Sequence, residues 1–112
     1  METTRQKKVA RLLQKELGEL FQRESRNMFN GAFITVTIVR ISPDLSFAKV
    51  YISMFAVKDK NEMLDMIKKK NKEIRTKLAE IIKNQVRAIP SFDFYIDDSL
   101  DYAEKIENLL KK

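Results

Sequence analysis

Residues 33–55 read FITVTIVRISPDLSFAKVYISMF, two runs of β-branched and aromatic residues on either side of a short turn. Both runs alternate along the chain, a pattern that predicts strands over residues 33–41 and 47–55. In the first strand, one face is expected to carry Ile34, Val36 and Ile38, and the other face Thr35, Thr37 and Val39. Pro43 presets φ in the turn, so the two strands should pair as an antiparallel hairpin.

A helix is expected before this hairpin, over residues 4–24. Its apolar residues recur at spacings of three and four, which places them on one stripe. The stripe consists of Val9, Leu12, Leu13, Leu17, Leu20 and Phe21. Thr3 or Thr4 could cap the start of the helix by accepting a hydrogen bond from a free backbone N–H. Asn27 and the pair Asn30-Gly31 then predict a loop, because asparagine and glycine tolerate positive φ.

A second helical pattern follows the hairpin, from about residue 61 to residue 87. Asp59 or Asn61 could cap its start, and Pro90 stops it shortly after its end. Its apolar seam contains one polar residue, Asn71. We therefore expect either a bend near residues 70–72 or two helices that meet there.

A third strand is predicted over residues 92–96, and a last helix, capped by Ser99, should follow it. The order of elements is α-β-β-α(α)-β-α. It predicts an α+β fold in which helices cover one face of a small three-stranded sheet, with residues 1–112 forming a single domain. The pattern leaves open which strand the third strand pairs with.

Charge and composition narrow the classes of function. The net charge is +6, and residues 1–90 carry 19 basic and 10 acidic residues, hence +9, against −3 for residues 91–112. This basic body suggests a polyanionic partner. The chain has no cysteine and no histidine, so thiolate zinc sites and Cys/His or Ser/His nucleophiles are excluded. We expect no cofactor and no small-molecule substrate. We also expect no signal peptide and no membrane segment, so the protein should be soluble and cytoplasmic. We expect it to act as a monomer.

Two groups of cations are the candidate RNA-binding residues. In the first helix they lie off the apolar stripe, and in the second they cluster around a run of lysines, with Lys68, Lys72 and Arg75 on one flank and Lys70 and Lys77 on the other. The full set is Arg5, Lys8, Arg11, Lys15, Lys68, Lys69, Lys70, Lys72, Arg75, Lys77 and Arg87. Such cations can neutralise phosphates and release counterions. The alternative is a helix surface that is merely solvated.

Other readings of the sequence stay open. Asp97, Asp98 and Asp101 could hold Mg²⁺ in a metal-dependent RNA-processing nuclease, although acidic residues at a helix start are also favoured by the helix dipole. Tyr51 and Phe47 could stack on bases, or could simply pack within the domain. A protein-binding adaptor, charged only for solubility, is a third class.

Several strings in the sequence form a recognisable series by their order and spacing. They are Lys8-Val9-Ala10, Thr35-Val36-Thr37, Ser42-Pro43-Asp44-Leu45, Ala48-Lys49-Val50-Tyr51-Ile52-Ser53, Ile74-Arg75, Val86-Arg87-Ala88-Ile89-Pro90-Ser91-Phe92-Asp93-Phe94 and Asp97-Asp98-Ser99-Leu100. Together they resemble the ribosome-binding factor A family over essentially the whole chain. The resemblance implies a type II KH-like fold without enzymatic activity. It also implies binding to the 30S ribosomal subunit, on 16S ribosomal RNA near its decoding-region helices. The implied role is late maturation, including 5′-end processing of that RNA, and growth in the cold.

The resemblance also locates a departure from the family pattern. Members of the family carry an Ala-x-Gly kink between two helices, in place of the GXXG loop with which KH domains clamp the nucleic-acid backbone. This kink falls on Lys70-Asn71-Lys72, which has neither the alanine nor the glycine.

Overall fold

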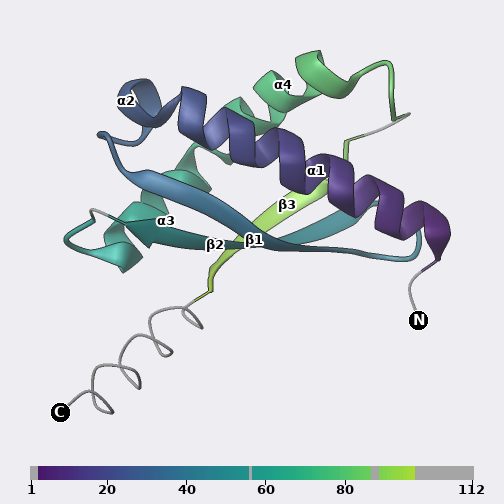
Figure 1. Ribbon diagram of the computed structural model, residues 1–112, viewed down its shortest axis with the longest axis horizontal. Coiled ribbons are helices and arrows are strands. Elements are labelled where there is room, and N and C mark those ends of the chain that lie inside the picture. The colour runs from purple at the N-terminus through teal and green to yellow at the C-terminus, as the bar shows by residue number, and fades with distance from the viewer. Residues whose placement is uncertain (1–2, 56, 87–88, 98–112) are drawn as a thin grey trace, which may run out of the picture.

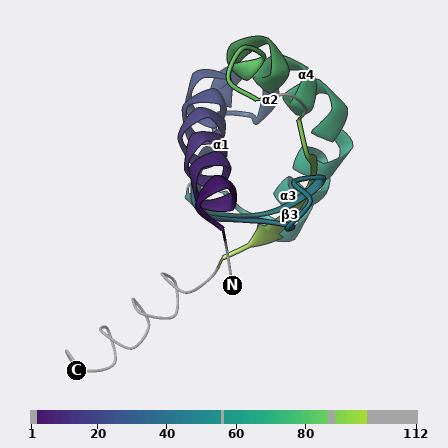
Figure 2. The same cartoon turned by 90° about the vertical axis from the view of Figure 1, so that its right-hand side faces the viewer.

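The computed structural model describes residues 3–55, 57–86 and 89–97 (Figure 1). Along the chain the elements are α1 (Thr4–Arg23), α2 (Ser25–Met28), β1 (Phe33–Ile41), β2 (Phe47–Phe55), α3 (Lys60–Lys69), α4 (Asn71–Ile82) and β3 (Ser91–Ile96). The strand order is β1-β2-β3, with β2 antiparallel to β1 and parallel to β3. The helices form an arc over one face of the sheet (Figure 2). The predicted α+β fold is confirmed, and β2 is the neighbour of β3 that the sequence left open.

The hairpin forms as expected, but β1 does not alternate along its whole length. Its pairing with β2 shifts between Val36 and Ile38, which leaves Thr37 as an extra residue on β1. An extra residue of this kind is a β-bulge, and it moves every later side chain to the other face of the sheet. The prediction for the end of β1 was therefore wrong: Ile38 is 42% exposed, whereas Val39 is buried.

The first helix is fixed at both ends by local hydrogen bonds. Thr3 caps it: its hydroxyl accepts from the Gln6 N–H, and the Gln6 side chain accepts from the Thr3 N–H, which makes a reciprocal capping box. The buried Gln6 amide also donates to the Ile41 carbonyl at 2.9 Å, which ties the start of α1 to the end of β1. After α1, the structure corrects the loop expected at Asn27, because residues Ser25–Met28 form one further helical turn. The positive φ expected of Asn30 and Gly31 is confirmed.

The long helical pattern divides into two helices at Lys70, one of the two outcomes expected. Asp59 caps α3 by accepting hydrogen bonds from the N–H groups of Asn61 and Glu62. The Asn71 side chain donates to the Phe92 carbonyl at 2.9 Å, which explains a polar residue in an apolar seam. The predicted end of the helix was wrong: α4 ends at Ile82, because the chain tightens into a turn in which Gln85 N–H donates to the Ile82 carbonyl. Arg87 lies outside the described residues.

The core lies between the helical arc and the sheet. Buried aliphatic residues of α1, α3 and α4 pack there against those of β1 and β2. Phe21 is at the centre, with its ring centroid 5.2 Å from that of Phe29 and 6.0 Å from that of Phe94. The helix expected after Ser99 falls outside the residues described. Among residues 3–55, 57–86 and 89–97, no helix has the length and apolarity needed to cross a bilayer.

Candidate nucleic-acid interface

The predicted cations of α1 form one exposed strip. Leu13, Leu17, Leu20 and Phe21 bury one side of the helix, and the cations lie on the side turned away from it. They are Arg5, Lys8, Arg11 and Lys15, all of them exposed. Within the part of the chain that the structure describes, none of the four is in an ion pair.

The predicted cations around the junction of α3 and α4 spread over more than one surface. Lys69, Lys70, Lys72 and Lys77 border one shallow groove of about 560 Å³. Lys72 and Arg75 border a second groove, of about 580 Å³, between α4 and the start of β3. Arg75 contacts the Ile89 carbonyl just before β3, and Lys77 contacts Glu24 just after α1. Lys72 borders both grooves, so the two predicted flanks are not cleanly separated.

Three of these cations already contact protein groups. Lys68 Nζ lies 3.9 Å from an oxygen of Asp93 and 6.0 Å from the centroid of the Tyr95 ring. Lys77 Nζ lies 3.9 Å from Glu24. The Arg75 guanidinium donates to the Ile89 carbonyl at 2.6 Å. A phosphate would have to share or replace each of these contacts.

Asp93 also acts on its aromatic neighbour. The Tyr95 hydroxyl donates to the Asp93 carboxylate at 2.7 Å. This hydrogen bond, together with partial desolvation, raises the pKa of Tyr95 above its ordinary value, because loss of the phenol proton would place two negative charges side by side. Asp93 is thus held by both Lys68 and Tyr95 and lowers the positive charge at this edge of the sheet.

The groove between α4 and β3 was not predicted from the sequence. Its lining includes Asn71, Thr76 and Ser91 beside the two cations, so donors and acceptors stand next to positive charge. The sequence contained part of the evidence for this groove. Asn71 interrupts an apolar seam, and a polar residue on the buried side of a helix usually has a specific hydrogen-bond partner. The identity of that partner, the Phe92 carbonyl 21 residues away, follows only from the fold.

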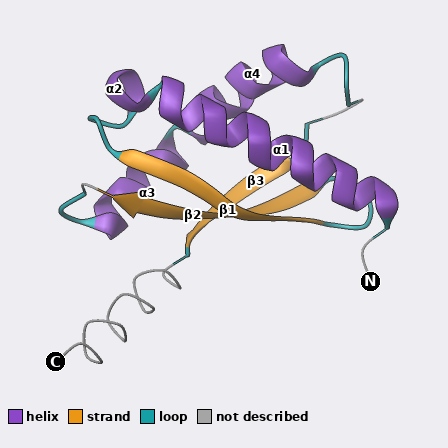
Figure 3. Cartoon of the chain, in the orientation of Figure 1, coloured by secondary structure: helices purple, strands orange, loops and turns teal. Residues whose placement is uncertain are grey.

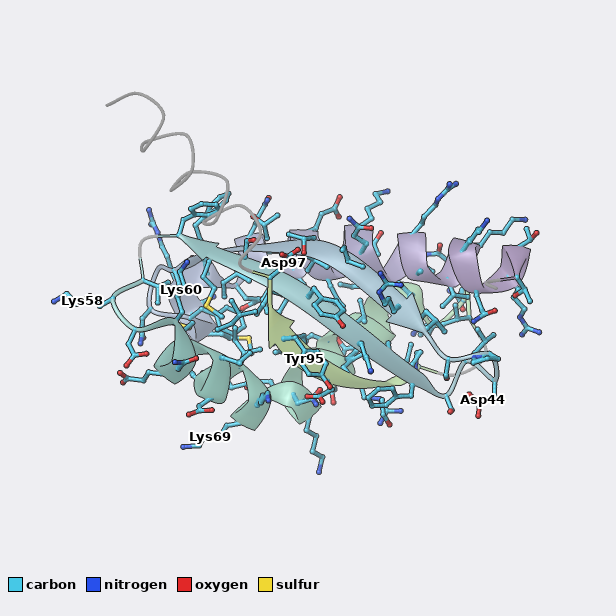
Figure 4. All side chains as sticks on the ribbon, turned by 90° about the horizontal axis from the view of Figure 1, so that it is seen from below. Asp44, Lys58, Lys60, Lys69, Tyr95 and Asp97 are labelled. Atoms are coloured by element: carbon cyan, nitrogen blue, oxygen red, sulfur yellow. The ribbon has the colours of Figure 1, made fainter. Side chains whose placement is uncertain are left out.

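Tyr95 lies on the face of the sheet that the described helices leave uncovered (Figure 4). The candidate stacking residues Phe47 and Tyr51 alternate along β2 with the buried Ala48 and Val50, so they point to the face opposite the core. Tyr51 pairs in register with Tyr95, and their rings lie 5.4 Å apart at 28°. Phe47 is 36% exposed. Stacking on bases by Tyr51 or Phe47 stays a prediction.

The carboxylates proposed for a magnesium site are described only in part. An Asp97 carboxylate oxygen accepts a hydrogen bond from the Thr37 hydroxyl at 2.7 Å, and the Asp97 N–H donates to the Ile52 carbonyl. Asp97 thus fastens the end of β3 to β1 and β2. Asp98 and Asp101 fall outside the residues that the structure describes. Among the residues described, no three acidic side chains gather as metal ligands would.

The fold and the surface together define a class: a small α+β domain of the type II KH-like kind, with cations concentrated on its helical side. The chain belongs to the ribosome-binding factor A family, whose model, described as "Ribosome-binding factor A", matches residues 5–110. A ribosome-binding factor A from Cytophaga hutchinsonii is 50% identical over 112 residues, which cover 100% of this chain and 84% of that relative.

Solved structures of the family share the fold. The crystal structure of ribosome-binding factor A from Thermus thermophilus aligns with a TM-score of 0.67 at 22% identity, over 81% of this chain and 94% of that one. A second Thermus thermophilus structure is a homology model of the same factor, fitted into a cryo-EM map of its complex with the 30S subunit. It aligns with a TM-score of 0.61 at 25% identity, over 78% of this chain and 89% of that one.

Proposed function

We propose that this protein binds the free 30S ribosomal subunit through its 16S ribosomal RNA and assists late maturation of the subunit. The observation that carries the proposal is membership of the ribosome-binding factor A family, one relative of which has been fitted into a map of a 30S complex. The proposal includes a role in 5′-end processing of 16S RNA and in growth in the cold. The protein would act in the cytoplasm as a monomer, with no cofactor, membrane or small-molecule substrate.

The proposed mechanism is binding without turnover. Cations of α1 and of the α3–α4 junction would neutralise phosphates, and release of the counterions would supply affinity that does not depend on sequence. A protein that binds one RNA conformation more tightly than another shifts the population toward the first. The body of the chain, with its charge of +9 over residues 1–90, is suited to this role.

The first experiment is co-sedimentation of the purified protein with 30S subunits, 50S subunits and whole ribosomes over a series of salt concentrations. We expect selective co-migration with 30S subunits and an affinity that falls steeply as salt rises. Absence of 30S binding at low salt would refute the proposal. Binding that does not change with salt would remove the electrostatic mechanism while leaving the partner in place.

A charge-reversal pair tests the surface. Lys69→Glu with Lys72→Glu should weaken 30S binding and leave thermal unfolding unchanged, because both side chains are exposed. The matched control is Arg26→Glu with Lys58→Glu, which changes the net charge equally at two other exposed positions. Equal loss in both variants would mean that only net charge matters, and no loss in the first would exclude the α3–α4 junction.

The nuclease alternative makes an opposite prediction. It requires Mg²⁺-dependent cleavage of RNA that is lost in Asp97→Asn, whereas a binding factor leaves the RNA intact. The hydrogen bond between Thr37 and Asp97 supports a structural role for this carboxylate. Incubation of pure protein with precursor 16S RNA, with and without Mg²⁺, separates the two functions.

A further inference from the structure

A groove of about 540 Å³ opens at the end of the molecule where α1 begins. Residues from three segments far apart in sequence line it: the start of α1, the turn between β1 and β2, and residues 85, 86 and 90 after α4. The start of α1 and the turn lie at the same end of the molecule (Figure 3). Its volume lies within the roughly 300–1,000 Å³ typical of small-ligand sites. The contacts described above for the helical cations do not involve this groove.

One wall of the groove is cationic. Arg5 and Lys8 line it from α1. Arg5 lies in the first turn of the helix, which contains no acidic residue. Cations are disfavoured in the first turn of a helix, where the dipole is positive, so Arg5 does not stabilise the helix through its charge.

The floor of the groove is apolar. Val9 of α1, Leu45 of the turn, and Val86 and Pro90 of the segment after α4 line it. Val9, Leu45 and Val86 are partly buried and pack against the core, so the floor is a continuation of the core to the surface. A flat apolar group such as a base can be received there without displacing charged side chains.

The opposite wall is a turn held in an unusual conformation. Leu45 has φ of 62°, an outlier for a bulky residue, and such outliers gather at functional sites. Asp44 holds the turn: one of its carboxylate oxygens accepts from the Ser42 hydroxyl at 2.7 Å, the Ser46 hydroxyl at 2.7 Å and the Ser46 N–H at 3.1 Å. These hydrogen bonds hold the pKa of Asp44 at about 2, so the carboxylate is ionised at neutral pH.

We propose that this groove binds one unpaired nucleotide of the RNA, with its phosphate on Arg5 and Lys8 and its base on Val9, Leu45 and Val86. The two walls set the direction of the nucleotide, because the cations attract the phosphate while the carboxylate of Asp44 accepts from a base amino group. Gln85, also at the groove, offers a donor and an acceptor to the edge of the base. Bases with an exocyclic amino group are therefore preferred to uracil. The inference rests on the proposed RNA binding and adds a specific site to it.

NMR titration of the full chain tests the proposal. The probes are single-base pentaribonucleotides of A, G, C and U, an abasic pentamer with the same backbone, and the four free nucleoside monophosphates. We expect the base-bearing pentamers to shift the amide signals of Leu45 and Val86, with the U pentamer weakest. The abasic pentamer should shift only signals near Arg5 and Lys8. Equal shifts with the abasic pentamer would overturn base binding, and saturation by a monophosphate as tight as by its pentamer would assign the groove to free nucleotides.

Two variants separate the contribution of the phosphate contacts to affinity from that of the base contacts. Arg5→Ala with Lys8→Ala should flatten the dependence of log affinity on log salt by about 0.7, since the two cations share one phosphate and each phosphate contact to a single strand contributes about 0.7. Leu45→Gly removes one apolar side chain of the floor but accepts the positive φ, so the turn is kept; affinity for the A pentamer should fall about tenfold, toward that of the abasic one. Arg11→Ala with Lys15→Ala, on the same helix outside the groove, should leave the shifts at Leu45 and Val86 in place.

A failure of the groove assignment can be told apart from a failure of the proposed function. If the wild-type protein co-sediments with 30S subunits but no pentamer moves the groove signals, the groove assignment is wrong and the proposed function stands. If the protein does not bind 30S subunits at all, the proposed function fails first. Wild-type affinity of the Leu45→Gly variant for the A pentamer would also overturn the groove assignment.

Discussion

The cations of α1 and those of the α3–α4 junction are similar in the sequence but differ in the structure. Each group comprises lysines and arginines on a helix, yet the four of α1 have no ion pair within the described residues. Around the junction, three of six contact a protein group: Lys68 contacts Asp93, Arg75 the Ile89 carbonyl, and Lys77 Glu24. A cation with such a contact must give it up, or share it, to bind a phosphate. Equal charge in the sequence therefore does not mean equal availability for RNA.

The largest effect is expected from the four cations of α1 together. Replacing Arg5, Lys8, Arg11 and Lys15 by alanine should flatten the salt dependence of 30S binding by up to about 3.6, the value for four separate phosphate contacts to a duplex at about 0.9 each. The comparison variant replaces Lys68, Arg75 and Lys77, which should flatten it by less than the roughly 2.7 that three full contacts would give. Equal loss per cation in the two co-sedimentation series would contradict the difference between the groups.

Asn71→Ala should lower the stability of the fold without changing the charge of the surface. Its amide donates to the Phe92 carbonyl, so the variant leaves that acceptor without its partner. We expect a loss of about 1–3 kcal/mol in the free energy of unfolding, measured with urea, and an unchanged salt dependence. Asn84→Ala, at an exposed position, should cost less than about 0.5 kcal/mol. Wild-type stability in Asn71→Ala would mean that this hydrogen bond does not hold the junction to β3.

Arg75→Ala and Arg11→Ala make a matched pair. Both arginines are exposed, but only Arg75 donates to a described backbone carbonyl. Loss of that bond should lower the free energy of unfolding by about 1 kcal/mol. Arg11→Ala should stay within about 0.5 kcal/mol of the wild type. The same stability in both variants would show that Arg75 is as free for RNA as the cations of α1.

Lys77→Ala should have the smallest effect. Its ion pair with Glu24 has an N···O distance of 3.9 Å, and the lysine side chain is 38% exposed. Ion pairs of this kind contribute about 0–1 kcal/mol. A double-mutant cycle with Glu24→Ala measures the pair itself. A coupling well above about 1 kcal/mol would place Lys77 among the structural residues of the domain and not among its phosphate ligands.

Much of the fold followed from local patterns in the sequence. The strands, α1 and the division near Lys70 were predictable because each depends on residues close in the chain. The β-bulge in β1 was not predicted, although the sequence contained a sign of it. Arg40 lies at an even spacing from Ile34 and Val36, so in a regular strand its side chain would point into the core with theirs. The pairing of β3 with β2 depends on long-range contacts, which alternation alone does not contain.

The candidate site was predictable in its charges but not in its partners. The sequence indicates exposed cations on the helices, and the structure confirms that those of α1 are exposed. The sequence could not indicate that Asp93 contacts Lys68 or that Ile89 contacts Arg75, since these contacts span 25 and 14 residues and form only on folding. The groove beside Arg5 was missed for the same reason, because its walls come from three separate segments.

The bulge at Thr37 also affects how copies of this protein meet in solution. β1 is an outer strand of the sheet, and the backbone of an outer strand can template the addition of a strand from another molecule. Here the strand is kinked at Thr37, and the Gln14 side chain of α1 donates to the carbonyl of that residue at 3.1 Å. Part of the outer edge is thus bent and already bonded. In a concentrated solution this edge is a poor seed for aggregation, which suits a small β-containing protein with several exposed aromatic rings.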